Sequence, residues 1–187
     1  VSRRANAMGR EREHRAPNRE SRSCRGFLFL RPPPQVVALL IGNGKYKSVP
    51  PLKNPVNDVL LQKHILLAIP NAEVIVVIDG TKQDMDNGIA EFESKLGPGC
   101  VGVFAYDGHA SEVDGINYLA PIDYDNPRMM RSILDSGTVA LHKILEMMEQ
   151  RQTLLNLCII DACRNNPFSN KSRGGKPDGG LAHTKAP

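Results

Sequence analysis

The sequence predicts an α/β domain built on a mainly parallel sheet. Continuous aliphatic runs recur at residues 36–42, 72–80, 100–106 and 154–161, and each has the composition of a strand that is buried on both faces. Residues 116–123 add a short extended segment after a turn. The segments between the long strands show helical spacing of apolar residues. Strands that alternate with helices are typical of βαβ units, which build parallel sheets.

The expected helices are marked by signals at their N-termini. Asn54 is a candidate N-cap, and Pro55 follows it at the favoured first helical position. Thr81 and Asp84 have the spacing of a capping box, in which each residue bonds to the backbone of the other. Residues 137–150 are the third expected helix.

Composition divides the chain into a tail, a domain and a second tail. Residues 1–34 hold nine Arg and three Glu and end in three prolines, so we expect a disordered segment. The domain is expected over residues 35–168, and residues 169–187 form a flexible Gly/Lys-rich tail. Although the whole chain carries a net charge of +4, residues 35–187 hold 15 basic and 17 acidic residues. This near-neutral balance argues against a nucleic-acid partner.

Cysteine usage and hydropathy indicate a compartment and exclude some partners. The four cysteines show neither a CxxC pair nor the spacing of a disulfide framework, which favours a reducing compartment, the cytoplasm. No apolar stretch approaches 18 residues, so we expect no membrane span and no membrane partner. We also expect no cofactor and no metal.

Two strand ends carry residues that suit nucleophilic catalysis. His109 lies just past the third strand, on an expected glycine turn, and Cys163 follows the fourth. If these strands are neighbours, the imidazole and the thiol meet at the carboxyl end of the sheet, where functional groups collect. The imidazole can then take the thiol proton. Either Asp107 or a backbone carbonyl would orient the ring, whereas Cys100 and Cys158 lie inside apolar strands and are assigned to core packing.

Two acids form a second candidate group. Asp161 interrupts the end of the fourth apolar strand, and Asp58 lies in the first helix. A carboxylate at such a position costs desolvation free energy unless a cation or a donor pairs with it. A substrate arginine would bind two carboxylates through its planar guanidinium. The chain's own Arg164 or a backbone cap would serve equally well, and the spacing alone does not decide.

The motifs together resemble the caspase-like cysteine peptidases of family C14, and among them most of all the paracaspases. The matching stretches are VVALLIGNGKY, PPLKNPVNDV, FAYDGHASEVDGINYLAPID and LLNLCIIDACRNNPF, which span residues 36–168. The separation of His109 and Cys163 is also near the ~50 residues of caspases. The resemblance implies a three-layer α/β/α caspase-like sandwich, with a p20-like half here and a p10-like half that is missing from the chain.

The resemblance also implies roles for individual residues. It makes the chain a cysteine endopeptidase that cleaves proteins or peptides after Arg or Lys, and it does not imply dependence on calcium. His109 is the general base and Cys163 the nucleophile, and the backbone N–H groups of Ala110 and Cys163 form the oxyanion hole. Asp58 and Asp161 line the S1 pocket. A second copy of the chain or a p10-like half is the expected protein partner.

Two departures from the family pattern support an alternative. Ala110 stands where the family usually has the second glycine of Gly-His-Gly, and Ala resists a positive φ, so strain in the oxyanion hole is expected. Asp107 replaces a small residue. Both departures favour a catalytically weak or inactive caspase-like scaffold or dimerisation domain. A nucleotide-binding protein that uses the IGNG loop ranks last, because this loop lacks both phosphate-binding glycine patterns.

Overall fold

The computed structural model describes residues 34–125 and 131–163, with only the backbone for residues 131–133 and for Cys163. The expected tails therefore lie outside the described residues, apart from Pro34. The elements in chain order are β1 (Val36–Gly42), α1 (Pro55–Leu67), β2 (Ala72–Ile78), α2 (Lys82–Lys95), β3 (Val101–Val113), β4 (Ile116–Leu119), α3 (Arg131–Gly137), β5 (Val139–Ala140), α4 (Leu141–Gln150) and β6 (Leu155–Cys163).

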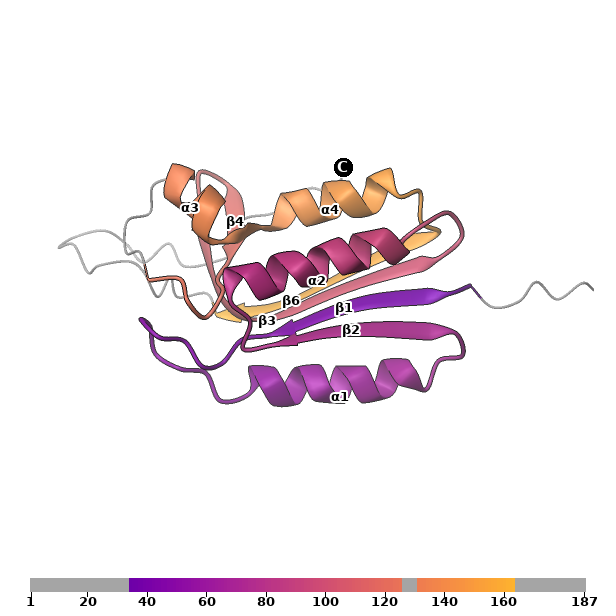
Figure 1. Ribbon diagram of the computed structural model, residues 1–187, viewed down its shortest axis with the longest axis horizontal. Helices are drawn as coiled ribbons and strands as arrows, with labels where there is room; N and C mark the ends of the chain where they lie inside the picture. Colours follow the sequence, from indigo (N-terminus) through magenta and orange to yellow (C-terminus); the bar gives the residue numbers. More distant parts are fainter. Residues whose placement is uncertain (1–33, 126–130, 164–187) are drawn as a thin grey trace, which may run out of the picture. The chain divides into compact units, whose positions relative to one another are not determined.

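A parallel sheet forms the centre, as the sequence predicted, and its strands lie in the order β2-β1-β3-β6. The antiparallel strands β4 and β5 continue it beside the carboxyl-terminal part of β3. Figure 1 shows α1 on one face of the sheet and α2 and α4 on the other. The predicted three-layer α/β/α arrangement is therefore confirmed.

β1 is the most deeply buried strand because both of its faces are covered. Val37, Leu39 and Ile41 pack into the core under α2 and α4, whereas Ala38 and Leu40 pack into the core under α1. All seven residues of β1 are buried. The continuous aliphatic run at this position correctly predicted a strand with two buried faces.

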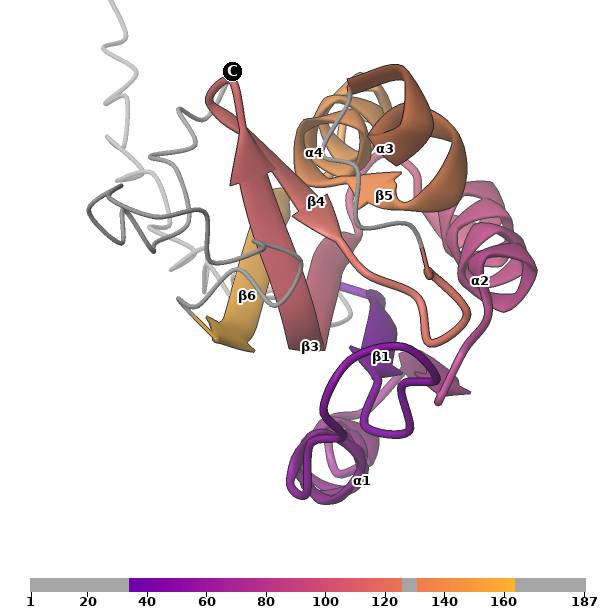
Figure 2. The same cartoon turned by 90° about the vertical axis from the view of Figure 1, so that its left-hand side faces the viewer.

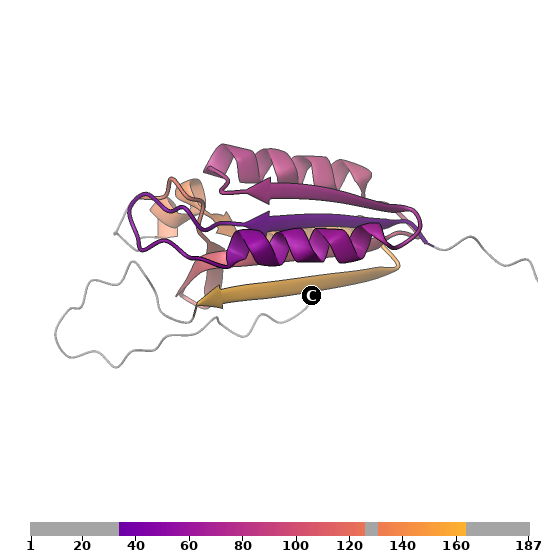
Figure 3. The ribbon, with the colours of Figure 1, turned by 90° about the horizontal axis from the view of Figure 1, so that it is seen from below.

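The expectation of two buried faces is wrong for the strands at residues 72–80 and 154–161. β2 pairs only with β1, and β6 pairs only with β3, within the described part of the chain. Leu155, Leu157 and Ile159 of β6 are 58%, 47% and 41% exposed. They lie on the face of the sheet that α1 covers at β1. Figure 3 shows that α1 lies in front of β1 and leaves β6 uncovered.

The starts of α1 and α2 were predicted correctly, although only α2 has a cap made by a side chain. In α2, Thr81 accepts a hydrogen bond from the Asp84 backbone N–H, and the Asp84 side chain accepts one from the Thr81 N–H, which completes the capping box. Pro55 is the first residue of α1, but the Asn54 side chain makes no capping hydrogen bond. No helix in the described residues is both long enough and apolar enough to cross a membrane.

Three elements differ from the sequence-based expectation. Residues 137–150 do not form one helix, because β5 precedes α4, and α3 was not predicted at all. β3 continues to Val113, so His109 lies inside the strand and not on a glycine turn. The pairing of Ala110 with Leu119 of β4 sustains this extension. Tertiary pairing therefore overrides the local turn tendency of glycine.

Candidate active site

His109 and Cys163 are direct partners in the parallel pairing of β3 with β6. Neighbouring strands in a sheet lie about 4.8 Å apart, so the two backbones are side by side at the carboxyl end. Figure 2 shows β3 and β6 running next to each other at this edge. The expectation that these two strands are neighbours is confirmed, whereas the Cys163 side chain lies outside what the structure describes.

The His109 ring is held by a backbone carbonyl. Its Nε2 lies 2.9 Å from the carbonyl oxygen of Pro50, and because a carbonyl only accepts, Nε2 carries the proton of the neutral ring. Nδ1 is then the basic nitrogen, and it is buried without a hydrogen-bond partner among the described residues. The ring also packs against Tyr46 with centroids 4.5 Å apart. Asp107, the other candidate to orient the ring, bonds elsewhere.

Two buried tyrosines fix the backbone around His109. The His109 N–H donates to the Tyr46 hydroxyl over 2.7 Å, and the Tyr106 hydroxyl donates to the His109 carbonyl over 2.6 Å. Burial raises the pKa of Tyr106 well above its ordinary value, so this hydroxyl stays protonated. A Cβ on Gly108 would lie 2.5 Å from the Tyr46 hydroxyl and 2.7 Å from the Tyr106 hydroxyl. The motif therefore needs glycine at this position because the hydroxyls approach so closely.

The sequence analysis missed both tyrosines. Tyr46 ends the GNGKY stretch and Tyr106 precedes the DGH stretch, so each lies close to a motif in the sequence. Position alone gives no indication that the two hydroxyls meet, 3.2 Å apart, beneath the same histidine.

Ala110 lies in extended backbone and carries no strain. Positive φ values at non-glycine residues in the described chain occur at other positions, so the expected strain at Ala110 is not found. The carbonyls of Asp107 and His109 accept from Asn43, after β1, and from Ala120, after β4, so both point to the β1 side of β3. The backbone N–H and C=O groups of successive residues in a strand point to opposite sides. The Ala110 N–H therefore points to the side of β3 where β6 runs.

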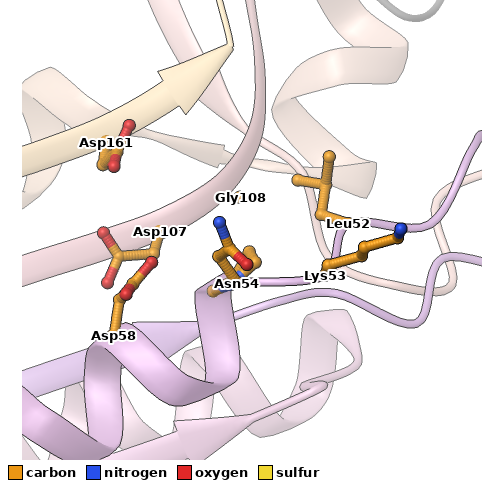
Figure 4. A pocket seen from close by; sticks show the side chains of 8 residues that line it. Leu52, Lys53, Asn54, Asp58, Asp107, Gly108 and Asp161 are labelled. Atoms are coloured by element: carbon orange, nitrogen blue, oxygen red, sulfur yellow. The ribbon is translucent and has the colours of Figure 1, made fainter.

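The two predicted pocket acids lie in one cavity, together with a third. Asp58 of α1, Asp107 of β3 and Asp161 of β6 line a cavity of about 200 Å³, and Figure 4 shows Asp58 close to Asp107, with Asp161 on the neighbouring strand. Asp107 and Asp161 are register partners on adjacent strands. The remaining lining residues are Leu52, Lys53, Asn54, Pro55 and Gly108.

Asp107 is the most buried of the three acids, with 2% of its surface exposed. Burial, followed by the negative charges of Asp161 and Asp58, raises the pKa of Asp107 to about 6. Gln62 Nε2 donates to one of its oxygens over 3.1 Å. The other oxygen, Oδ1, is buried and has no hydrogen-bond partner among the described residues. Arg164, the alternative partner for these acids, lies outside the described residues.

The remaining cysteines and acids give no further site in the described ranges. The Cys100 thiol is buried and donates to the Gly97 carbonyl over 2.7 Å. Burial raises the pKa of Cys158 to about 11, so this thiol stays protonated near neutral pH. The assignment of Cys100 and Cys158 to packing is confirmed. Within residues 34–125 and 131–163, no group of three His, Cys, Asp or Glu side chains is placed to hold a metal ion.

Comparison with known proteins relates this chain to one family of peptidases. A family described as Peptidase C14, caspase domain, matches residues 35–186. Mucosa-associated lymphoid tissue lymphoma translocation protein 1 of Homo sapiens and its homologue in Mus musculus are each 34% identical to this chain over 128 residues, which is 68% of the chain. The chain spans only 15% of the length of these relatives.

A solved structure supports the fold independently. The crystal structure of a protein from Geobacter sulfurreducens superposes on this chain with a TM-score of 0.53 at 14% sequence identity. The superposed region covers 70% of this chain and 51% of the Geobacter chain. At this identity the likeness shows the fold alone. The family match extends over most of the sequence and agrees with the motifs at the strand ends. The chain therefore belongs to the caspase-domain family of peptidases.

Proposed function

We propose that this chain is a cysteine endopeptidase in which His109 is the general base and Cys163 the nucleophile. One observation carries the proposal: the two residues are partners at the carboxyl ends of β3 and β6. The Pro50 carbonyl holds Nε2 of His109, which leaves the basic Nδ1 without a partner in the described structure. A nitrogen in this state is available to accept the proton of a neighbouring thiol.

The proposed reaction begins with transfer of the Cys163 proton to Nδ1 of His109. The thiolate attacks the substrate carbonyl carbon, and the backbone N–H groups of Ala110 and Cys163 donate to the oxyanion that forms. The direction of the Ala110 N–H toward the β6 side of β3 supports this role. The imidazolium returns the proton to the leaving amine, and water then hydrolyses the thioester.

The proposed substrates are proteins or peptides with a basic residue before the cleaved bond. The three carboxylates of the cavity support this preference, because a cationic side chain is the complement of a negatively charged, half-enclosed pocket. Asp58 and Asp161 contribute the charge that the sequence analysis anticipated, and Asp161 stands two residues before the nucleophile.

Fluorogenic peptides that differ only in the residue before the cleaved bond test the proposal. We expect faster cleavage after Arg than after Lys, little cleavage after Asp, and loss of all cleavage in Cys163→Ala. Cys24→Ala, which removes a thiol far away in the sequence, is the matched control and should keep the activity. Cleavage that survives Cys163→Ala would contradict the proposed nucleophile.

Limiting iodoacetamide gives a second test that does not need turnover. Cys100 is buried and the pKa of Cys158 is raised to about 11, so both should react slowly. We expect Cys163 to be alkylated before either of them, with the adducts mapped by peptide mass spectrometry. Preferential labelling of Cys158 would contradict the assignment.

The alternative function is a catalytically silent caspase-like module that binds a partner. The exposed leucine and isoleucine side chains of β6 favour it, because an apolar strand face of this kind is typical of an interaction surface. A p10-like half or a second copy of the chain is the expected partner. This alternative predicts that the chain cleaves none of the peptides and that Cys163→Ala associates with its partner as strongly as the parent.

A further inference from the structure

We propose that Asp107 is a third substrate-binding carboxylate, which together with Asp58 and Asp161 holds a guanidinium group in the cavity of Figure 4. The inference rests on the proposed function, because it assigns a further specificity residue to the same substrate pocket. It also gives a role to an acid that stands where the family pattern has a small residue.

The geometry of Asp107 indicates a ligand that the described chain does not supply. The carboxylate is 2% exposed and lies at the wall of the cavity, and only one of its oxygens is bonded, to Gln62. The second oxygen, Oδ1, is buried without a partner among the described residues. A buried acceptor without a hydrogen bond destabilises the folded chain, and more so when it is charged. A donor that enters the cavity would recover this lost stability.

No cation in the described part of the chain neutralises the three acids. Lys53 lines the same cavity, but Figure 4 shows its side chain directed away from Asp58 and Asp107. The ion pairs of the described residues involve other acids: Asp79, Asp86, Glu73, Glu91 and Glu93. The negative charge of the pocket is therefore left for a ligand to balance.

A guanidinium fits this arrangement better than an ammonium does. Its five N–H donors lie in one plane and can reach several carboxylates at once, whereas an ammonium is a compact point charge that is more strongly hydrated. Asp107 and Asp161 approach from neighbouring strands and Asp58 from the helix α1, so the three acids surround the ligand from different elements. The cavity of about 200 Å³ is several times the roughly 30 Å³ that one water molecule occupies in the liquid.

Binding should depend on pH through Asp107. Its pKa is raised to about 6 by burial and by the charges of Asp161 and Asp58, so the carboxyl loses its proton as the pH rises through that value. Lys53 also lies at the cavity wall, with its side chain directed away from Asp107, and Tyr106, which interacts electrostatically with Asp107, has a raised pKa that keeps it neutral across this range. Affinity for an arginine side chain should therefore increase between about pH 5 and 7.

The test measures binding directly in the full chain carrying Cys163→Ala, so that no turnover is required. The probes are N-acetyl-arginine amide and N-acetyl-lysine amide, which carry one positive charge each, and calorimetry gives both affinities. We expect the arginine probe to bind more tightly than the lysine probe. Asp107→Asn should weaken arginine binding about tenfold or more, reduce the preference over lysine and remove the rise in affinity near pH 6.

Two further variants separate a ligand role from a structural one. Gln62→Leu removes the hydrogen-bond partner of Asp107 but leaves the carboxylate in place, so arginine binding should persist. Glu149→Gln removes one exposed negative charge from α4 and should leave the affinity unchanged. If Asp107 served the fold alone, Gln62→Leu and Asp107→Asn would reduce binding together, and this result would overturn the inference.

The outcomes also distinguish this inference from the proposed peptidase activity. Equal affinity of Asp107→Asn and its parent for the arginine probe would overturn the role of Asp107, even if cleavage after Arg is observed. Conversely, arginine binding that depends on Asp107, in a chain without thiol-dependent cleavage, would support this pocket and contradict the peptidase proposal.

Discussion

Asp107 and Gly108 are adjacent residues of β3 that are restricted by different neighbours. The carboxylate of Asp107 is buried beside two other acids, so electrostatics dominates its contribution to the fold. Gly108 lies under two tyrosine hydroxyls, so steric exclusion dominates there. Each constraint gives a prediction for a single substitution.

Asp107→Asn should stabilise the fold near neutral pH. The pKa of Asp107 is about 6 in the folded chain and about 3.9 in an unfolded one, so between these values the folded state binds more protons. The free energy of unfolding contributed by Asp107 therefore falls as the pH rises from about 4 to 6, and this loss persists above pH 6. We expect Asp107→Asn to be more stable by about 1–2 kcal/mol at pH 7.5, a value reduced for screening by solvent in the open pocket.

Urea denaturation at pH 4 and pH 7.5 checks this prediction. The gain should nearly vanish at pH 4, and Glu149→Gln should show no such gain at either pH. A variant that is less stable than the parent at pH 7.5 would contradict the burial of a charged Asp107. Together with the binding test, a stabilised variant that binds arginine poorly would show that the acid is retained at the expense of stability.

Gly108→Ala should destabilise the fold by about 1–3 kcal/mol, because its Cβ would overlap the Tyr46 and Tyr106 hydroxyls. Thermal unfolding of Gly108→Ala, Tyr46→Phe and the double variant measures the effect. Removal of the Tyr46 hydroxyl makes room for the methyl group, so the double variant should lose less than the sum of the two single losses. Strict additivity would indicate that the methyl group is accommodated without contact with Tyr46.

At the scale of elements, the two longest helices begin in different ways. α2 has a capping box in which the Thr81 hydroxyl accepts from the Asp84 N–H, whereas the Asn54 side chain before α1 bonds to no backbone group of its helix. The local sequence marked both starts equally well. Only the structure shows which cap is made by a side chain.

Thr81→Ala and Asn54→Ala form a matched pair of cap substitutions. Thr81→Ala should lower the free energy of unfolding by about 1 kcal/mol, because it leaves a helical N–H without its acceptor. Asn54→Ala should change it by less than about 0.5 kcal/mol, since no side-chain capping bond is lost. Chemical denaturation of the two variants measures both values, and equal losses would contradict the difference between the caps.

At the scale of the whole sheet, burial is uneven from centre to edge. β1 is enclosed on both faces, whereas α1 leaves β6 uncovered (Figure 3), and Leu157 and Ile159 of β6 are exposed. Two leucines that both lie in apolar stretches of the sequence therefore contribute differently to the free energy of unfolding. Leu39 is fully buried, and Leu157 is 47% exposed.

Leu39→Ala should destabilise the chain by about 2–5 kcal/mol, because it opens a cavity between the sheet and the helix α2. Leu157→Ala removes the same atoms from a half-exposed position and should lower the free energy of unfolding by less than about 1 kcal/mol. Denaturation at low protein concentration measures both effects on the isolated chain. A large loss at Leu157 that grows with protein concentration would indicate that β6 is covered by a second copy.

The sequence by itself determined the succession of the four parallel strands, the starts of α1 and α2, the buried centre of the sheet, and the candidates His109, Cys163, Asp58 and Asp161. These features follow from periodicity, cap spacing and motifs, which are local properties of the chain. The family resemblance extended them to proposed roles.

Tertiary structure decided which groups meet. Pairing of β3 with β6 brings His109 opposite Cys163, and the loop before α1 supplies the Pro50 carbonyl that sets the tautomer of the ring. It also turns Asp107 toward the pocket acids and away from the histidine. Such contacts join segments far apart in the sequence, and register between strands depends on packing across the whole sheet, so no local pattern encodes them.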